Sequence, residues 1–399
     1  MADLHHPLET SIVRILDARG AIVGAGFLAA PELVCTCAHV VAEALNISPE
    51  TEQQPKGEVH LDFPFLGGAE VHACVKVWVR VEPNGDGGDI AVLRLMVAPP
   101  SAARPVRVLQ VSHLSGRAFK AYGFPRTTDI GQYAYGIMRD RLANGYIQLE
   151  GTTRQGYRIQ QGYSGTPVWD SNGRGVVGMV VAEEKDAEAK VAFLIPNDLI
   201  LQSCPDIKPI TLHQLFAPLT EGLTGLPGSP LSGVEQFLRE YLGTPEVPAP
   251  FGGRYLQLAE LDRWLANPAQ PYALLVAEAG RGKSALLAHW VATVADEHRA
   301  EMVLVPISIR FSTSLKSTTV SLLGARLRHL HRARADLPRD AEGWLAEIDM
   351  YLREDRPVGP PLLIVLDGAD EAADWMVGRD LRFPLEPGRG IKVLVSARP

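Results

Sequence analysis

The sequence QGYSGTPVWD, residues 161–170, places a serine, Ser164, in a glycine-bearing turn. Two further short motifs precede it in the chain: TCAHVV, which contains His39, and GGDIAVLRL, which contains Asp89. His39 and Asp89 lie 50 residues apart, and Asp89 and Ser164 lie 75 residues apart. These separations leave room for several strands, as a site assembled across two small β-barrels requires.

Short β-rich runs surround these motifs from residue 11 to about residue 200, and Gly, Pro, Asn and Asp break them. The runs include AIVGAGFLAA (21–30), LVCTCAHVV (33–41) and GVVGMVVAE (175–183). We interpret residues 33–41 as a strand that includes His39. Regularly spaced short strands favour an antiparallel sandwich or barrel over β-α-β units.

The order His, Asp, Ser on a β scaffold, with TxAHV, DIAVL and GxSGxP around the three residues, resembles the trypsin-like peptidases over roughly residues 11–200. The resemblance implies a double barrel in which Ser164 is the nucleophile, His39 the general base and then acid, and Asp89 the residue that orients His39. A serine hydroxyl needs a neutral imidazole to accept its proton, and a carboxylate holds that imidazole in the right tautomer. Asp86 is the competing carboxylate, but the DIAVL pattern favours Asp89.

The resemblance also implies an oxyanion hole made by the backbone N–H groups of Gly162 and Ser164. It suggests Val180–Glu183 and Ala192–Leu194 as candidate pocket residues. The sequence departs from the digestive branch of the family at two positions. Tyr163 replaces the aspartate that pairs with a freed N-terminus, and Arg158 replaces an acid six residues before the serine. We therefore expect neither activation by N-terminal cleavage nor a preference for basic substrate residues.

The composition changes to Pro and Gly after residue 215, around one amphipathic piece, VEQFLREYL. We interpret residues 216–252 as a linker with a short helix. Beyond it, apolar strands alternate with helical segments, which predicts an α/β domain with a parallel sheet. The predicted multi-domain organisation is therefore an all-β domain at 1–215, the linker at 216–252, and an α/β domain at 253–399.

The α/β region contains a candidate phosphate loop in LLVAEAGRGKSALL, residues 274–287. The match is AxxxxGKS, because Ala277 replaces the first glycine of the usual pattern. The small loop lets backbone N–H groups surround phosphate at a helix N-terminus. Lys283 would reach the β- and γ-phosphates, and the Ser284 hydroxyl would ligate Mg²⁺. The candidate loop residues are Ala279, Gly280, Arg281, Gly282, Lys283 and Ser284.

A second motif, PLLIVLDGADE at residues 361–371, is an apolar strand that ends in acids. Asp367 would hold Mg²⁺ beside the loop, and Asp370 and Glu371 would lie near an attacking water. DGADE resembles the NACHT-type and related STAND signalling ATPases. That resemblance, over roughly residues 250–399, implies ATP and Mg²⁺ as cofactors and Arg398 as a sensor of the γ-phosphate. It also makes Gly253 and Arg254 candidates for contacts with adenine.

Composition limits the remaining function classes. Lys and Arg number 39 against 46 Asp and Glu, a net charge of −7, so we expect no specific nucleic-acid binding. We expect the basic stretch at 326–339 to be a solvated helix face. No run reaches about 18 apolar residues, and the first residues lack a signal pattern, which predicts a cytoplasmic protein without a membrane span. Four cysteines without CxxC-like pairs argue against a disulfide framework or a zinc site, and we interpret Cys35 and Cys37 as packing thiols.

These observations predict a serine endopeptidase effector that is regulated by an ATP-binding signalling module, in a bacterial defence or stress response. The expected partners are a protein substrate, ATP and other copies of the chain in a nucleotide-dependent homo-oligomer. The α/β domain is expected to be incomplete, because the chain stops just after its sensor strand. The alternative is a catalytically silent trypsin-fold binding module coupled to a signalling ATPase. A processive ATP-dependent protease ranks third, because we find no aromatic-hydrophobic-Gly pore loop.

Overall fold

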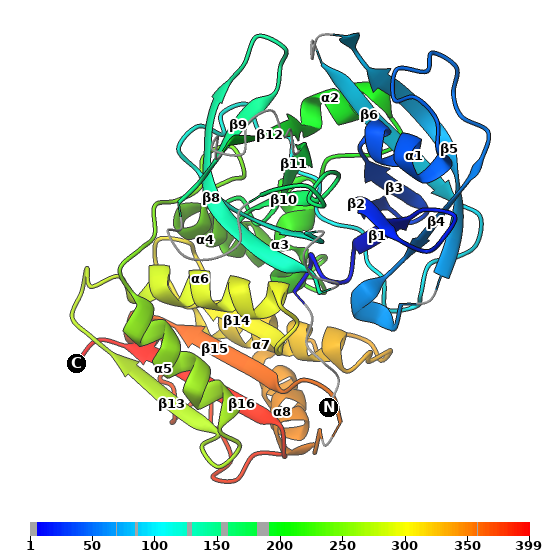
Figure 1. The fold of residues 1–399 in the computed structure, drawn as a ribbon. Coiled ribbons are helices and arrows are strands. Elements are labelled where there is room, and N and C mark those ends of the chain that lie inside the picture. Colours follow the sequence, from blue (N-terminus) through cyan, green and yellow to red (C-terminus); the bar gives the residue numbers. More distant parts are fainter. Residues whose placement is uncertain are drawn as a thin grey trace. The chain divides into compact units, whose positions relative to one another are not determined.

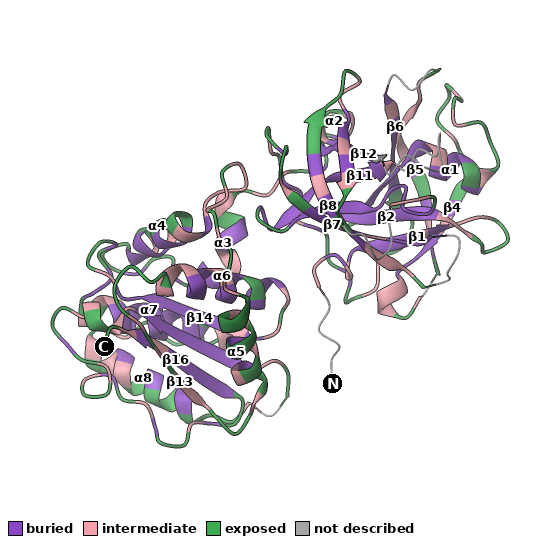
Figure 2. Ribbon diagram, turned by 60° about the vertical axis from the view of Figure 1, so that its left-hand side comes forward, coloured by how far each residue is buried: buried purple, intermediate pink, exposed green. Residues whose placement is uncertain are grey.

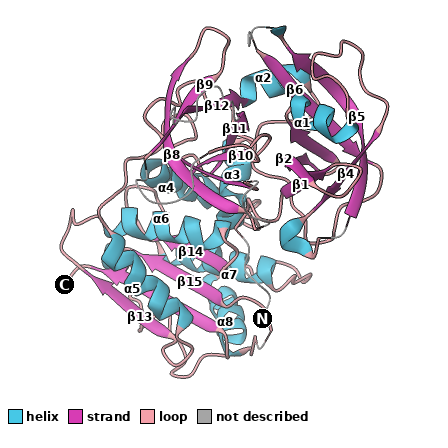
Figure 3. Cartoon of the chain, viewed as in Figure 1, coloured by secondary structure: helices cyan, strands magenta, loops and turns pink. Residues whose placement is uncertain are grey.

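The computed structural model describes residues 6–68, 70–83, 87–125, 130–152, 159–181, 191–356 and 358–399. The chain divides into two compact units (Figure 1). The first unit runs up to Thr211 and also includes Pro245–Val247, whereas the second comprises Leu212–Thr244 and Pro248–Pro399. Figure 3 shows that strands dominate the first unit and that helices cover a sheet in the second.

The first unit begins with a closed antiparallel barrel. Among the described residues, its six strands pair in the order β1-β2-β3-β6-β5-β4. Their bounds are β1 Ile12–Leu16, β2 Ile22–Ala30, β3 Leu33–Thr36, β4 Glu58–Asp62, β5 Glu70–Val81 and β6 Gly88–Leu95. Helix α1 (Ala38–Leu45) follows β3, and a short 3-10 helix, η1 (Pro64–Leu66), follows β4. Ile12, Phe27 and Val92 are among the side chains that fill the barrel core.

A second closed antiparallel barrel completes the first unit. Its described strands pair in the order β10-β11-β12-β9-β8-β7. Their bounds are β7 Ala118–Gly123, β8 Gln132–Arg141, β9 Ile147–Gly151, β10 Pro167–Asp170, β11 Gly175–Val181 and β12 Val191–Pro196, with helix α2 at Asn197–Ser203. The two barrels confirm the predicted all-β, trypsin-like double-barrel architecture. Strands β4, β8 and β10 were not among the predicted β-rich runs. Charged and exposed positions obscure the apolar alternation in β4 and β8, and β10 has only four residues.

The structure corrects the interpretation of residues 33–41 as one strand. β3 ends at Thr36 and α1 begins at Ala38, so His39 lies in the first turn of a helix. Val40, Val41 and Ala44 are all buried there. A short apolar run fits either a strand or a buried helix, because its pattern distinguishes the two poorly.

The second unit contains a parallel sheet. Within its described part, four strands pair in the order β13-β16-β15-β14. Their bounds are β13 Tyr272–Val276, β14 Glu301–Pro306, β15 Leu362–Asp367 and β16 Ile391–Ala397. Every residue of β15 is buried, and Figure 2 shows strands of this sheet largely in the purple of buried residues. β16 lies between β13 and β15, so the ends of these three strands meet at one edge of the sheet.

Helices cover both faces of this sheet (Figures 1 and 2). α6 lies in the connection from β13 to β14, which crosses the sheet from one edge to the other. α7 and α8 lie in the connection from β14 to the neighbouring strand β15, and this connection crosses the sheet in the opposite direction. Right-handed crossovers in opposite directions place their helices on opposite faces. The helices are α3 Leu212–Thr220, α4 Pro230–Leu242, α5 Tyr255–Ala266, α6 Lys283–Asp296, α7 Lys316–Leu330 and α8 Ala341–Arg353, with the short η3 at Ala369–Glu371.

Residues 216–252, interpreted above as a linker, hold more structure than one short helix. α4 and most of α3 lie in this segment, and both helices pack against α6 and β14. Phe237, Leu238 and Leu242 are buried in this contact. Many of the Pro and Gly residues lie in the loops around α4, but Pro218 lies inside α3, and Pro230 and Gly233 lie in α4 itself. Pro245–Val247 belongs to the first unit.

The basic stretch at 326–339 is not a uniformly solvated face. Arg326 and Arg328 are buried. Arg326 donates to the carbonyl oxygens of Pro218 at 2.8 Å and Met302 at 2.9 Å, and also to that of Glu221. Burial lowers the pKa of Arg326 to about 10. The expectation is therefore wrong for these two arginines, because carbonyl groups and carboxylates elsewhere in the fold bind them.

Candidate active site and phosphate-loop pocket

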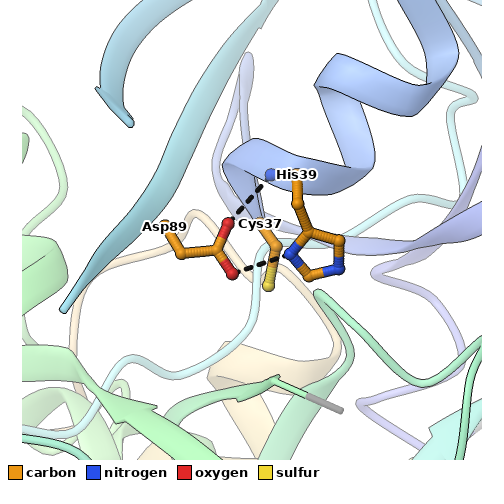
Figure 4. Close-up of side chains that lie close together, drawn as sticks. All are labelled: Cys37, His39 and Asp89. Carbon is orange, nitrogen blue, oxygen red and sulfur yellow. Dashed lines mark hydrogen bonds and ion pairs between the residues drawn. The ribbon is translucent and has the colours of Figure 1, made fainter. Parts of the chain in front are cut away.

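His39 and Asp89 form a two-point contact in the first unit. Asp89 Oδ2 lies 2.7 Å from His39 Nδ1, and Asp89 Oδ1 accepts a hydrogen bond of 2.8 Å from the backbone N–H of His39 (Figure 4). Asp89 lies in β6 and is 4% exposed. The second ring nitrogen of His39 is on the far side of the ring from the carboxylate. The contact fixes the orientation of the ring and keeps Nε2 away from Asp89.

The environment of His39 raises its pKa. Burial by itself lowers the pKa of the imidazole, because desolvation penalises the charged form. The negative charge of Asp89, the hydrogen bond to it and the charge of Glu43 act in the opposite direction and outweigh burial. His39 therefore holds a proton more tightly than an isolated histidine, as a general base beside a carboxylate should.

Cys37 lies next to this pair, with its ligand atom within 4.8 Å of those of His39 and Asp89. Its thiol is buried and contacts the carbonyl oxygen of Val180 at 3.4 Å. Burial raises the pKa of Cys37 well above the usual value of a thiol. The thiolate is the nucleophilic and metal-binding form of cysteine, so Cys37 is a packing residue at neutral pH.

The backbone around Ser164 is attached to the first barrel. The carbonyl oxygen of Ser164 accepts a 2.9 Å hydrogen bond from the N–H of Ala25 in β2. A side-chain carbon added at Gly24 would lie 2.7 Å from Val40 and 3.3 Å from that same carbonyl oxygen. Since Val40 directly follows His39, the serine turn and the start of α1 are close neighbours across the barrels. The structure thus brings the backbone of Ser164 to the segment that carries His39.

The turn before Ser164 depends on glycine. Gly162 has φ +99°, and an added side-chain carbon would lie 1.9 Å from the carbonyl oxygen of Phe124. The carbonyl of Gly162 accepts a 2.9 Å hydrogen bond from the N–H of Phe124, which anchors the turn to the second barrel. Tyr163 is buried, and its hydroxyl donates to the carbonyl of Gln132 at 3.0 Å. The oxyanion hole formed by the backbone N–H groups of Gly162 and Ser164 stays a prediction.

Some of the predicted residues lie outside the described part of the chain. These are Asp86, Arg158 and the last two residues of the pocket segment Val180–Glu183. Val180 itself is buried and forms two backbone hydrogen bonds with the residues after Ser164. Its carbonyl oxygen accepts from the N–H of Gly165 at 2.9 Å, and its N–H donates to the carbonyl oxygen of Thr166 at 2.8 Å. Residues 192–194 pair with β9 and β11.

The predicted phosphate loop lines a pocket of about 330 Å³ in the second unit. The lining includes the loop from Ala279 to Ser284 and the acids that follow β15. All the residues predicted above for the phosphate loop, the metal and the γ-phosphate line this pocket: Ala279, Gly280, Arg281, Gly282, Lys283, Ser284, Asp367, Asp370, Glu371 and Arg398. The central position of β16 explains this convergence, because it places Arg398 between the end of β13 and the end of β15.

Asp367 is the buried acid of this pocket, with 3% exposure. Burial raises its pKa, although hydrogen bonds from Ser284 and Ser396 and the charge of Lys283 act against that shift. The Ser396 hydroxyl also accepts a 2.9 Å hydrogen bond from the N–H of Gly368. Ser284 and Asp367, the predicted Mg²⁺ ligands, line the same pocket.

The charged side chains of the pocket are held within it. Lys283 Nζ donates to the carbonyl oxygens of Ala277 at 2.6 Å and Glu278 at 3.3 Å, so it folds back across the loop. Arg398 pairs with Asp370 at 2.9 Å and with Glu371 at 3.3 Å.

Sequence reasoning missed Tyr241, which lines this pocket, and Ser396, which binds the pocket acid Asp367. Tyr241 lines it from α4, inside the segment interpreted as a linker, and no motif marks it. Ser396 binds Asp367, and its position two residues before Arg398 was the only available signal. Arg254, a candidate for adenine contact, donates to the carbonyl of Arg281 at 2.7 Å, so it lies beside the loop.

Comparison with known proteins supports a trypsin-like peptidase domain in the first unit. Residues 24–179 match the family model "Trypsin-like peptidase domain". Two curated relatives from Mycobacterium tuberculosis strains, "Serine protease MT3772" and "Serine protease Rv3671c", are each 26% identical over 197 residues. The match covers 47% of this chain and 43% of each relative, so the chain spans less than half of their length.

Solved structures of such proteases also align with the chain. The inactive form of the Rv3671c protease is 21% identical, with a TM-score of 0.36, and the alignment covers 50% of this chain and 90% of that one. A serine endoprotease from Yersinia pestis is 17% identical, also with a TM-score of 0.36, over 50% of this chain and 64% of that one. In the described part of the chain, no helix has the length and hydropathy that crossing a bilayer requires.

Proposed function

We propose that the first unit is a serine endopeptidase that uses Ser164, His39 and Asp89. The observation that carries the proposal is the two-point contact of Asp89 with the ring and backbone of His39, beside the anchored backbone of Ser164. A carboxylate that binds Nδ1–H leaves Nε2 as the proton acceptor. The match to serine proteases supports the same chemistry.

In this mechanism the Ser164 hydroxyl oxygen attacks the carbonyl carbon of the scissile peptide bond, while His39 Nε2 takes the hydroxyl proton. Asp89 stabilises the imidazolium that forms and stays ionised. The proton then passes from His39 to the leaving amine, and the peptide C–N bond breaks to leave an acyl-enzyme. Water, activated by His39, releases the acid product. The N–H groups of Gly162 and Ser164 would stabilise the oxyanion, at about 3 kcal/mol for each donor.

We further propose that the second unit binds ATP–Mg²⁺. The donor set fits this ligand, because a lysine, a serine and a buried carboxylate line one pocket at the N-terminus of α6. Lys283 would release its loop carbonyls and bind phosphate oxygens, and Ser284 and Asp367 would hold the metal. When bound, the γ-phosphate supplies the charge that distinguishes ATP from ADP. Arg398 would pair with that charge in place of Asp370 and Glu371.

Regulation of the peptidase by this nucleotide site completes the proposal. An ATP-dependent homo-oligomer would gather several peptidase domains, which would then cut a protein target in a defence or stress response. The resemblance of DGADE to STAND ATPases supports this step, together with the covalent connection of the two units.

The test is labelling of the chain by a fluorophosphonate probe with and without ATP–Mg²⁺. We expect labelling that requires Ser164, increases with ATP, and loses its ATP response in Lys283→Ala. Lys316→Ala is the matched control, because Lys316 is also the first residue of a helix but lies outside the pocket. Absence of labelling in every state would favour the silent binding module. Ser164-dependent labelling of equal extent with and without ATP–Mg²⁺ would support the peptidase activity and contradict its regulation by nucleotide.

A further inference from the structure

Two histidines face each other on the surface of the first barrel, outside the catalytic site. His60 in β4 and His72 in β5 are directly opposite in the antiparallel register. Their ring centroids lie 4.4 Å apart, at an interplanar angle of 55°. Opposite residues of an antiparallel pair project to the same face of the sheet. The pairing therefore brings together two imidazoles that are distant in the sequence.

Carboxylates flank both imidazoles. Glu70 Oε1 lies 2.6 Å from His60 Nδ1, and Glu58 Oε2 lies 3.4 Å from His72 Nδ1. One ligand atom each from His60, Glu70 and His72 lies within 4.8 Å of the others. Their side chains are between 38% and 54% exposed, so they can rotate without disturbing the core. The strand alternation places all four residues on one face.

This set has the chemistry of a divalent transition-metal site. Two histidines and one carboxylate are a recurrent three-ligand set for zinc, with water in the fourth position. Metal–ligand distances of about 2.1 Å in a tetrahedron require ligand atoms roughly 3.4 Å apart. The ligand atoms lie within 4.8 Å of one another, so rotation of the partly exposed side chains would have to bring them to this spacing when a metal binds. The acidic neighbour Glu58 adds a favourable negative potential.

We propose that His60, Glu70 and His72 form a Zn²⁺ site that connects β4 to β5. α1, which carries His39, packs on both strands. A metal across this pair would therefore stiffen the sheet beneath the catalytic helix without touching the catalytic residues. The cysteine pattern gave no indication of zinc, because the ligands are histidines that the sheet register brings together.

Isothermal titration of the full chain with zinc chloride tests this site. A Cys74→Ser background removes the exposed thiol, which has its own affinity for zinc. We expect saturable binding of one ion, with at least a tenfold loss of affinity in His60→Ala and in His72→Ala. The matched control is His213→Ala, because His213 pairs with Glu235 at 2.9 Å in a His–Glu contact that lacks a second histidine. That variant should bind zinc like the parent.

Folding of the variants is checked by far-ultraviolet circular dichroism and by the metal-free melting temperature, which these surface changes should leave nearly unchanged. In a second measurement, Co²⁺ replaces zinc, and the intensity of its visible absorption reports the ligand geometry. Absence of zinc binding by the parent chain would overturn the proposal. So would equal affinity of the folded His60→Ala and His213→Ala variants.

Discussion

His39 combines two properties that its contact with Asp89 controls, namely ring orientation and proton affinity. The carboxylate binds the ring at Nδ1 and the backbone N–H of the same residue. Because His39 is in the first turn of α1, the helix start and the side chain are held by one acid. A base with a raised pKa is protonated, and therefore inactive, over a wider acidic range.

Replacement of Asp89 by Asn should lower kcat/KM by about 10³ to 10⁴-fold, because the neutral amide no longer holds the required tautomer. The peptidase rate of the parent should fall as the pH decreases through a value above the ordinary histidine pKa. Loss of the Asp89 charge lowers the pKa of His39, so this acidic limb should move to lower pH. The pH profile of kcat/KM measures both effects. Glu43→Gln should also move the acidic limb of the pH profile to lower pH, but by less than Asp89→Asn. An acidic limb that does not move in Asp89→Asn would show that the Asp89 charge does not raise the pKa of His39.

Gly162→Ala should reduce activity by at least 100-fold and destabilise the first unit by about 1–3 kcal/mol. The added carbon would lie 1.9 Å from the backbone of Phe124, so the serine turn must move. Peptidase assays and urea denaturation measure the two effects. Gly116→Ala is the control, because Gly116 also has a positive φ, +81°, but has no atom within 4 Å of an added carbon. Equal effects of the two changes would show that φ alone matters.

At the scale of elements, an ion pair at the end of β10 attaches Pro245–Val247, the part of the first unit that follows α4 in the chain, to the strand after the serine turn. β10 begins at Pro167, three residues after Ser164, and ends at the fully buried Asp170. Arg117 pairs with Asp170 at 2.8 Å, and the same guanidinium donates to the carbonyl of Pro245 at 2.7 Å. Pro245–Val247 is therefore attached to the strand that follows the serine.

Arg117→Ala should destabilise the first unit by about 3–5 kcal/mol, because it leaves the carboxylate of Asp170 buried without its charged partner. Thermal and urea unfolding of the full chain measure this change. Arg139→Ala, which removes an exposed pair with Glu150, should change stability by less than about 1 kcal/mol. The double change Arg117→Ala with Asp170→Asn should recover part of the loss. A single variant as stable as Arg139→Ala would show that the buried pair contributes little.

At the scale of the whole molecule, two sites of different chemistry occupy separate compact units. The His39–Asp89 pair lies in the barrel unit, and the pocket lined by the predicted phosphate loop lies in the α/β unit. Binding of a ligand to one folded unit stabilises that unit by mass action. The location of the stabilisation therefore identifies the unit that binds nucleotide.

ATP–Mg²⁺ at 100 times its dissociation constant should stabilise the second unit by about 2.7 kcal/mol. Hydrogen exchange resolved by mass spectrometry should show slower exchange in α6 and β15, and Lys283→Ala should abolish the change. Exchange in the core strands of the barrels serves as the internal reference. Protection confined to the barrels would place the nucleotide site elsewhere.

The sequence by itself predicted the features that depend on residues close together in the chain. The regular spacing of short β-rich runs predicted the all-β unit, and the alternation of apolar strands with helical segments predicted the parallel sheet, because both are local patterns. The serine turn at Ser164 and the candidate phosphate loop at 279–284 are local patterns too, and their functions stay predictions. The tertiary structure decided that His39 lies in the first turn of a helix, that Arg326 is buried, that Tyr241 lines the same pocket as residues 279–284 and that His60 opposes His72. Each of these depends on strand register or packing between distant segments, and a local pattern carries no record of which distant residues it will meet.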